Sequence, residues 1–183
     1  MEAELSSDGY WLAALIWAVV AAALVLLLRW RVRREALEGA RWAVPVAAAL
    51  FWGVLAAVLV RVYWEAYYQH FYSAPLRLVV LLVTPFFYAA LGALLWWLAR
   101  RLSGNAPVTF CLLGGLEALV EHLVAIYRLG ILERVPMLQG ADPLAVLAFS
   151  VPEYVVYWGL VLGLAALLAR ARRMLVASRP TAG

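Results

Sequence analysis

Residues 10–28 read YWLAALIWAVVAAALVLLL, nineteen residues without a single charge. An α-helix rises 1.5 Å per residue, so about 20 apolar residues are needed to cross the roughly 30 Å hydrocarbon core of a bilayer. The stretch is therefore predicted to be a transmembrane helix. An acidic segment precedes it and the arginine-rich RWRVRR follows it. Because this charge order is the reverse of that in a cleavable signal peptide, we expect the helix to be retained.

Four further apolar runs of similar length follow along the chain. Together they predict an all-α fold, a polytopic integral membrane bundle of five transmembrane helices that forms one domain over residues 1–183. The predicted helices are 10–28, 44–64, 76–99, 108–127 and 144–169. The composition agrees, because 67% of the residues are hydrophobic, against roughly 45–50% in ordinary soluble domains. The connections are too short to hold a separate catalytic module.

The basic residues predict how the bundle is oriented. All 15 are arginine, and most lie in three groups, at 29–41, at 100–101 and at 170–179. With five spans the three groups fall on one side, so the positive-inside rule predicts an outside N-terminus and a cytoplasmic C-terminus. Arginine in place of lysine indicates a GC-rich bacterial genome and hence a bacterial cytoplasmic membrane. The lipid bilayer is the expected partner, other membrane subunits or further copies of the chain are left open, and no nucleic acid is expected.

Prolines inside two of the predicted spans indicate bends. Pro85 and Pro152 each lie about ten residues into a helix, where proline removes an intrahelical hydrogen bond, so the third and fifth helices are predicted to kink. We expect Pro152 to present Glu153 to the bundle interior. Pro107 and Pro143 are instead expected at the first turns of helices, where a missing N–H costs little.

The stretch LGGLEALVEHLVAIYR, residues 113–128, places ionisable side chains inside a predicted span. At 100° per residue, Glu117, Glu121 and Arg128 fall within about 40° of one another, and His122 points roughly a quarter-turn away. Insertion scales assign roughly 2.5–3.5 kcal/mol to an acidic residue at mid-bilayer, so the stripe is predicted to face protein rather than lipid.

Other helices contribute polar residues to the same outer half. Glu153 lies in the fifth predicted helix, and Arg61, Glu65 and His70 lie near the outer end of the second. The candidate ligand- or ion-binding residues are Glu117, Glu121, His122, Glu153, Arg128, Arg61 and Glu65. The residues considered for a divalent metal, the one cofactor weighed, are Glu117, Glu121, His122, Glu153 and His70. The Glu-x-x-His spacing of carboxylate-bridged di-metal bundles does not occur among them.

Three functions fit this cluster. The favoured interpretation is a site that binds or conducts a small ligand, a proton or a cation, with aromatic residues such as Tyr154, Tyr157 and Trp158 lining it or packing the core. The second is a non-catalytic subunit or assembly factor of a larger membrane complex, in which ion pairs hold the helices in register. The expected pairs are Arg61 with Glu65, and Arg128 with Glu121 or Glu153. The third is a membrane-embedded metal-dependent enzyme, for which the sequence contains no diagnostic motif and assigns no catalytic residue.

Overall fold

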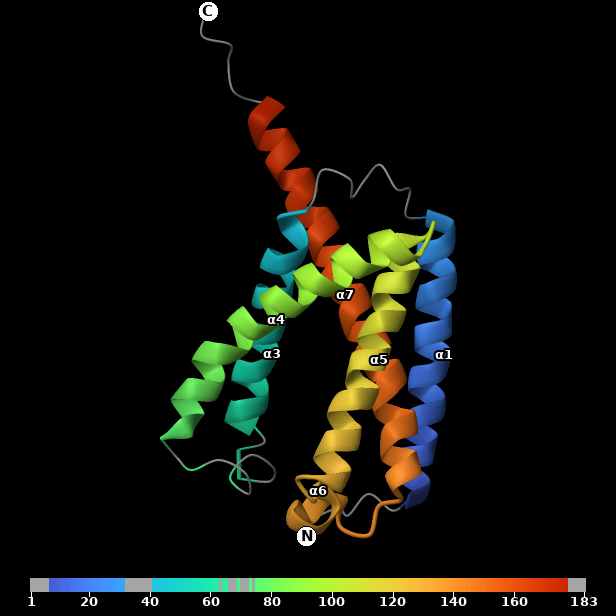
Figure 1. Ribbon diagram of the computed structural model, residues 1–183, viewed down its shortest axis with the longest axis vertical. Helices are drawn as coiled ribbons and strands as arrows, with labels where there is room; N and C mark the ends of the chain where they lie inside the picture. Colours follow the sequence, from blue (N-terminus) through green and yellow to red (C-terminus); the bar gives the residue numbers. More distant parts are fainter. Residues whose placement is uncertain are drawn as a thin grey trace, which may run out of the picture.

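The computed structural model of the chain describes residues 7–31, 41–62, 64, 65, 69, 73 and 75–177, and within them every regular element is a helix (Figure 1). Five helices are long and apolar enough to cross a membrane, which confirms the predicted number of spans. They are α1 (Ser7–Arg31), α3 (Ala43–Val62), α4 (Leu76–Leu102), α5 (Ala106–Tyr127) and α7 (Pro143–Ala177). Between α5 and α7 lie the short helix α6 (Ile131–Arg134) and the 3-10 helix η2 (Pro136–Leu138).

Local sequence sets where the helices α5 and α7 begin. The side chain of Asn105 accepts a hydrogen bond from the backbone N–H of Val108 at 3.3 Å, which caps the first turn of α5, and Pro107 occupies that turn. Asp142 caps α7 in the same way through Leu144 N at 2.9 Å, and Pro143 is the first residue of the helix. Both prolines therefore lie where the sequence predicts them.

The helices alternate in direction, and α3, α4, α5 and α7 each pack on the next of them in sequence, whereas α1 packs mainly on α7. In Figure 1, α3 and α5 run from the upper to the lower end, and α1, α4 and α7 run the other way. α7 lies between α1 and α5, while α3 joins this group to α4, which crosses the bundle obliquely. At the lower end, α6 and η2 fold against the ends of α5 and α7. Their small apolar core comprises Tyr10, Ile126, Ile131, Val135, Leu138, Ala141, Ala145 and Val146.

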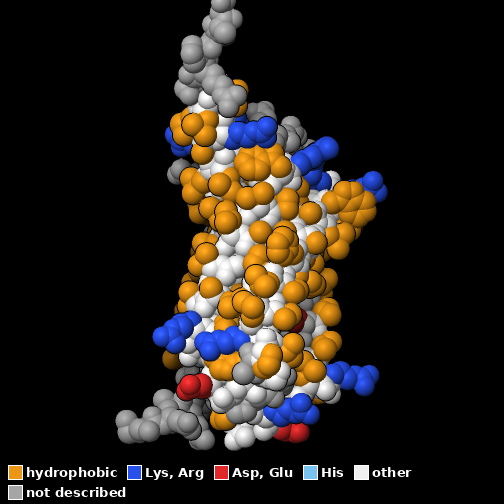
Figure 2. All heavy atoms as spheres, turned by 90° about the vertical axis from the view of Figure 1, so that its left-hand side faces the viewer, with side chains coloured by type: hydrophobic (Ala, Val, Ile, Leu, Met, Phe, Trp, Pro, Cys, Tyr) orange, Lys and Arg blue, Asp and Glu red, His pale blue; other side chains and the backbone are white. Residues whose placement is uncertain are grey.

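The surface of the bundle is apolar between two charged ends. Large side chains such as Leu15, Val54 and Leu160 are exposed on the sides of the helices. On the face drawn in Figure 2, hydrophobic side chains cover the middle of the molecule and arginines gather toward both ends. A soluble bundle would place polar residues on these faces, so this surface is suited to contact with lipid.

The two internal prolines lie inside continuous helices, Pro85 in α4 and Pro152 in α7. One or two residues before each proline, a hydroxyl bonds back to its own helix. Thr84 Oγ1 donates to the carbonyl of Val80 at 2.7 Å, and Ser150 Oγ donates to that of Val146 at 2.8 Å. Such bonds four residues back often accompany helix bending. The kinks themselves stay predictions.

Candidate functional site

Each of the three glutamates inside the spans accepts a hydrogen bond from an aromatic side chain of α7. Tyr154 donates its hydroxyl to Glu121 at 3.2 Å, and the indole N–H of Trp158 reaches Glu117 at 3.5 Å. The Tyr157 hydroxyl donates to Glu153, one turn away on α7 itself, at 2.5 Å. The first two bonds link α5 to α7. Glu117 is half-buried against α7, as the spacing predicts, whereas Glu121 and Arg128 are exposed, so the stripe faces protein only in part.

Glu117 and Glu121 lie one turn apart on α5, so their side chains project from the same face of the helix. Glu117 is half-buried, whereas Glu121 is exposed. At 1.5 Å per residue, Glu121 lies about 9 Å and Glu117 about 15 Å from the end of α5 at Tyr127. The pair therefore occupies the half of the bundle that the orientation prediction places outside.

His122 has the hydrogen-bond partner that a histidine inside a span requires. Its Nδ1 lies 2.9 Å from the carbonyl oxygen of Ala118, one turn back on α5. A carbonyl can only accept, so Nδ1 carries the proton of this bond, and Nε2 is the nitrogen left for other chemistry. The ring meets that of Tyr154 edge to face, with centroids 5.7 Å apart. Tyr154 therefore contacts both polar residues at positions 121 and 122.

Aromatic rings from three other helices pack against the α7 donors. Trp158 is fully buried and packs edge to face with Phe110 of α5, with centroids 5.2 Å apart. The Trp52 ring of α3 stacks on the Tyr88 ring of α4, with centroids 4.0 Å apart, and its centroid lies 5.2 Å from that of Tyr154. Tyr154, the donor to Glu121, is thus connected through the Trp52 ring to Tyr88 in the core.

Two glycines let the Trp158 ring lie this close to the helix backbones. A Cβ atom on Gly114 of α5 would lie 1.9 Å from Cδ1 of Trp158, and one on Gly92 of α4 would lie 3.3 Å from its Cζ3. Any side chain at Gly114 would therefore occupy the space of the indole. The glycine fixes the distance from Trp158 to Glu117, three residues further along the same helix.

The arginines and Glu65 lie apart from these carboxyl groups. Arg61 is exposed in the last turn of α3, and Arg128 is exposed just after α5. Glu65 is exposed beyond the end of α3, where its backbone carbonyl accepts a hydrogen bond from the Gln69 side chain. Within the described ranges, none of the expected arginine–glutamate ion pairs forms. Arginines at helix ends extend toward the polar interface, which accounts for their separation from carboxyl groups deeper in the spans.

The metal hypothesis gains no ligand set from the described residues. Among them, no group of three His, Cys, Asp or Glu side chains lies close enough to hold a metal ion. His70, which the sequence also proposes as a ligand, lies outside the described residues.

Sequence reasoning missed Trp52 and Tyr88, and it did not assign the α7 aromatics as donors to the glutamates. One signal was available, since Tyr157 follows Glu153 by four residues and positions four apart share a helix face. The contacts between helices had no such signal. No family model, curated protein or solved structure matches the chain.

Proposed function

We propose that this chain is a multi-pass protein of the bacterial cytoplasmic membrane whose Glu117–Glu121 pair binds and exchanges a proton or a small cation. The observation that carries the proposal is the position of these two carboxyl groups, one turn apart on the same face of α5, with a tyrosine and a tryptophan of α7 as their donors and no arginine paired with them among the described residues. Two carboxylates side by side repel each other, most strongly where water is scarce. A shared proton or a bound cation removes that repulsion.

The aromatic donors give each carboxyl group a role in this proposal. Glu121 is exposed and nearer to the helix end, so it exchanges the proton or cation with the outer side. Glu117 is half-buried and receives it within the bundle. A tyrosine hydroxyl both donates and accepts, so Tyr154 can also take up or release a proton beside Glu121. The Nε2 atom of His122, whose ring contacts Tyr154, is a further acceptor.

The distribution of charge supports the proposed orientation. The described arginines at the upper end of Figure 1 have no described acidic residue beside them; they are Arg29, Arg41, Arg100, Arg101, Arg170, Arg172 and Arg173. The opposite end carries both signs, namely Arg61, Arg77, Arg128 and Arg134 with Asp8, Glu65, Glu133 and Asp142. The positive-inside rule then assigns the upper end to the cytoplasm.

Infrared difference spectroscopy tests the proton-binding role directly. Protein in liposomes is stepped between acidic and alkaline external buffer, and the C=O band of protonated carboxyl groups is followed. We expect Glu117→Gln and Glu121→Gln each to remove a component of this band, and Glu133→Gln, which changes an exposed glutamate in α6, to leave that component in place. If both variants keep the wild-type spectrum, and added Na⁺ or K⁺ does not change it either, the pair does not bind these ions.

The same hydrogen bonds favour a second candidate function, a structural subunit of a larger membrane complex. Tyr154 and Trp158 of α7 already give Glu121 and Glu117 one donor each, as expected if these two glutamates serve to join α5 to α7. In that case the Gln variants would lower stability without any loss of proton or cation binding. Stable co-purification of other chains with the wild-type protein would also favour this function.

A further inference from the structure

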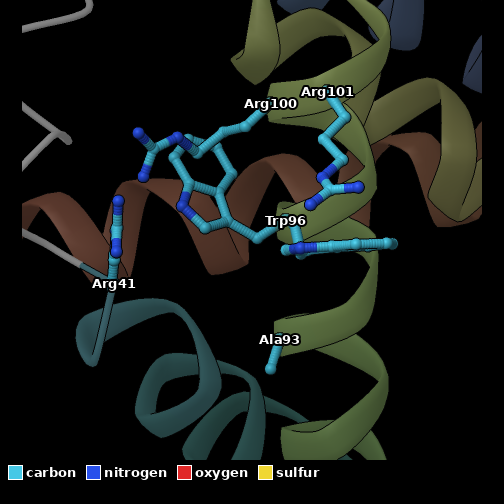
Figure 3. Close-up of a pocket in the computed structure, with 6 residues that line it drawn as sticks. Arg41, Ala93, Trp96, Arg100 and Arg101 are labelled. Carbon is cyan, nitrogen blue, oxygen red and sulfur yellow. The ribbon is translucent and has the colours of Figure 1, made fainter.

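A pocket of about 450 Å³ opens at the arginine-rich end of the bundle, beside the last turns of α4 (Figure 3). The glutamate pair lies on α5, toward the opposite end. It lies between Arg41, just before α3, and the last turns of α4. The described residues that line it are Arg41, Ala93, Trp96, Trp97, Arg100 and Arg101. Half of them are arginines and none is acidic, so the pocket is suited to an anion.

The arginines approach the pocket from two different segments. Figure 3 shows Arg41 reaching it from one side and Arg100 and Arg101 from α4 on the other. The guanidinium carbon of Arg101 lies 4.3 Å from the Trp97 ring centroid, a cation–π contact that holds the side chain in place. Positive groups that surround a common space repel one another, and a bound anion turns this repulsion into attraction.

Trp96 adds a neutral donor without an acceptor. Its side chain is only 6% exposed, and its indole Nε1 is buried without a hydrogen-bond partner. In Figure 3 the ring lies beside the ends of Arg41 and Arg100. A buried N–H without an acceptor is costly, and the pocket is where an acceptor oxygen can enter.

We propose that this pocket binds the phosphate group of an anionic ligand, with Arg41, Arg100 and Arg101 supplying charge and Trp96 a further N–H. Guanidinium groups suit phosphate because they donate paired hydrogen bonds to its oxygens. The surroundings favour a phospholipid headgroup as the source over free phosphate. Leu94, Trp97 and Leu102 are exposed on α4 beside the pocket, where they can contact acyl chains. Basic pockets at the cytoplasmic ends of spans bind anionic headgroups in other membrane proteins.

Lipid binding to the full chain tests this proposal. Purified protein in a non-ionic detergent is titrated with phosphatidylglycerol or with zwitterionic phosphatidylcholine, and bound lipid is counted by native mass spectrometry. We expect phosphatidylglycerol to bind more tightly. Arg100→Gln should weaken it by about tenfold, because a charged hydrogen bond is lost. The matched control is Arg173→Gln, an exposed arginine of α7 outside the pocket, which should change the affinity by less than about twofold.

A second arm distinguishes free phosphate from lipid. Thermal unfolding is measured with inorganic phosphate and with chloride at equal ionic strength. Stabilisation by phosphate that Arg100→Gln abolishes, together with equal binding of both lipids, identifies free phosphate as the ligand and supports the same pocket chemistry. Trp96→Phe keeps an aromatic ring but removes the N–H, and it should weaken whichever ligand binds by several-fold. The proposal is overturned if neither ligand binds preferentially, or if Arg173→Gln weakens binding as much as Arg100→Gln.

Discussion

A Cβ atom at Gly114 would lie 1.9 Å from Cδ1 and 2.7 Å from Nε1 of Trp158, so a hydrogen is the largest substituent that this position accepts. Because the Trp158 ring also packs against Gly92 and Phe110, it cannot move aside freely. The contact between α5 and α7, and with it the bond from Trp158 to Glu117, depends on this glycine.

Gly114→Ala is therefore expected to destabilise the protein although alanine is the better helix former. Overpacking a tight core typically costs about 1–3 kcal/mol. Thermal unfolding in detergent measures the effect, and tryptophan fluorescence should report the displaced indole. The control is Gly163→Ala on α7, where nothing lies within 4 Å of the new methyl group. That change should be neutral or slightly stabilising. Equal stability of the two variants would show that Trp158 is not confined by α5.

Glu121→Gln separates a functional role for the carboxyl group from a structural one. A glutamine oxygen can still accept from the Tyr154 hydroxyl, and no arginine loses an ion-pair partner among the described residues. We therefore expect a loss of stability below about 1 kcal/mol while proton or cation binding at the pair is lost. Unfolding and the infrared spectrum are measured on the same liposome sample. A large loss of stability with unchanged binding would make the cluster a structural network.

At the scale of the helices, hydropathy predicts the spans well and their ends less well. α7 continues to Ala177, eight residues beyond the predicted end at 169. Residues 170–177 stay helical although the apolar run has ended. The elements α6 and η2 were not predicted, since a four-residue helix and a three-residue turn leave no periodic pattern to detect. Apolar length identifies what crosses the membrane, whereas helix ends depend on local caps.

The bend predicted at Pro152 can be tested by its effect on the outer end of α7. About nine residues, or roughly 13 Å, separate Pro152 from the start of the helix, so a bend above about 20° moves that end sideways by roughly 5 Å. Spin labels at the exposed positions Leu144 on α7 and Val62 on α3 report this displacement by pulsed electron paramagnetic resonance. We expect Pro152→Ala to shift their mean distance by several Å, because the N–H restored at 152 can bond the carbonyl of Ala148. An unchanged distance would mean that Pro152 does not bend α7.

At the scale of the whole molecule, sequence predicts which residues share a helix face but not which helix they meet. The spacing of Glu117 and Glu121 predicts one stripe, and both accept bonds from α7. Their donors come from positions 33 and 41 residues away, because glycines and rings set how α5 packs on α7. The ion pairs were not found because complementary charge in the sequence says nothing about depth, and Arg128 lies at the end of the bundle.

The charges at its two ends predict the orientation of the whole bundle in the membrane. Five spans place the two ends of the chain on opposite sides, and the arginine-rich end of the bundle includes the last turns of α7. Moving these charges across the bilayer is strongly disfavoured, so that end should stay in the cytoplasm. After Gly183, a reporter that works only in the cytoplasm should therefore be active. Beside the exposed Gln139, between η2 and α7, only a reporter that works outside the membrane should be active. A variant in which four arginines are removed from the end of α7 and placed in the loop at Gln139 should contain a larger fraction of molecules inserted in the reverse orientation. Reporters that read the same side at both positions would rule out five crossings. The reverse labelling would place the glutamate pair in the cytoplasmic half of the membrane. It would then lack the access from the outer side on which its proposed function depends.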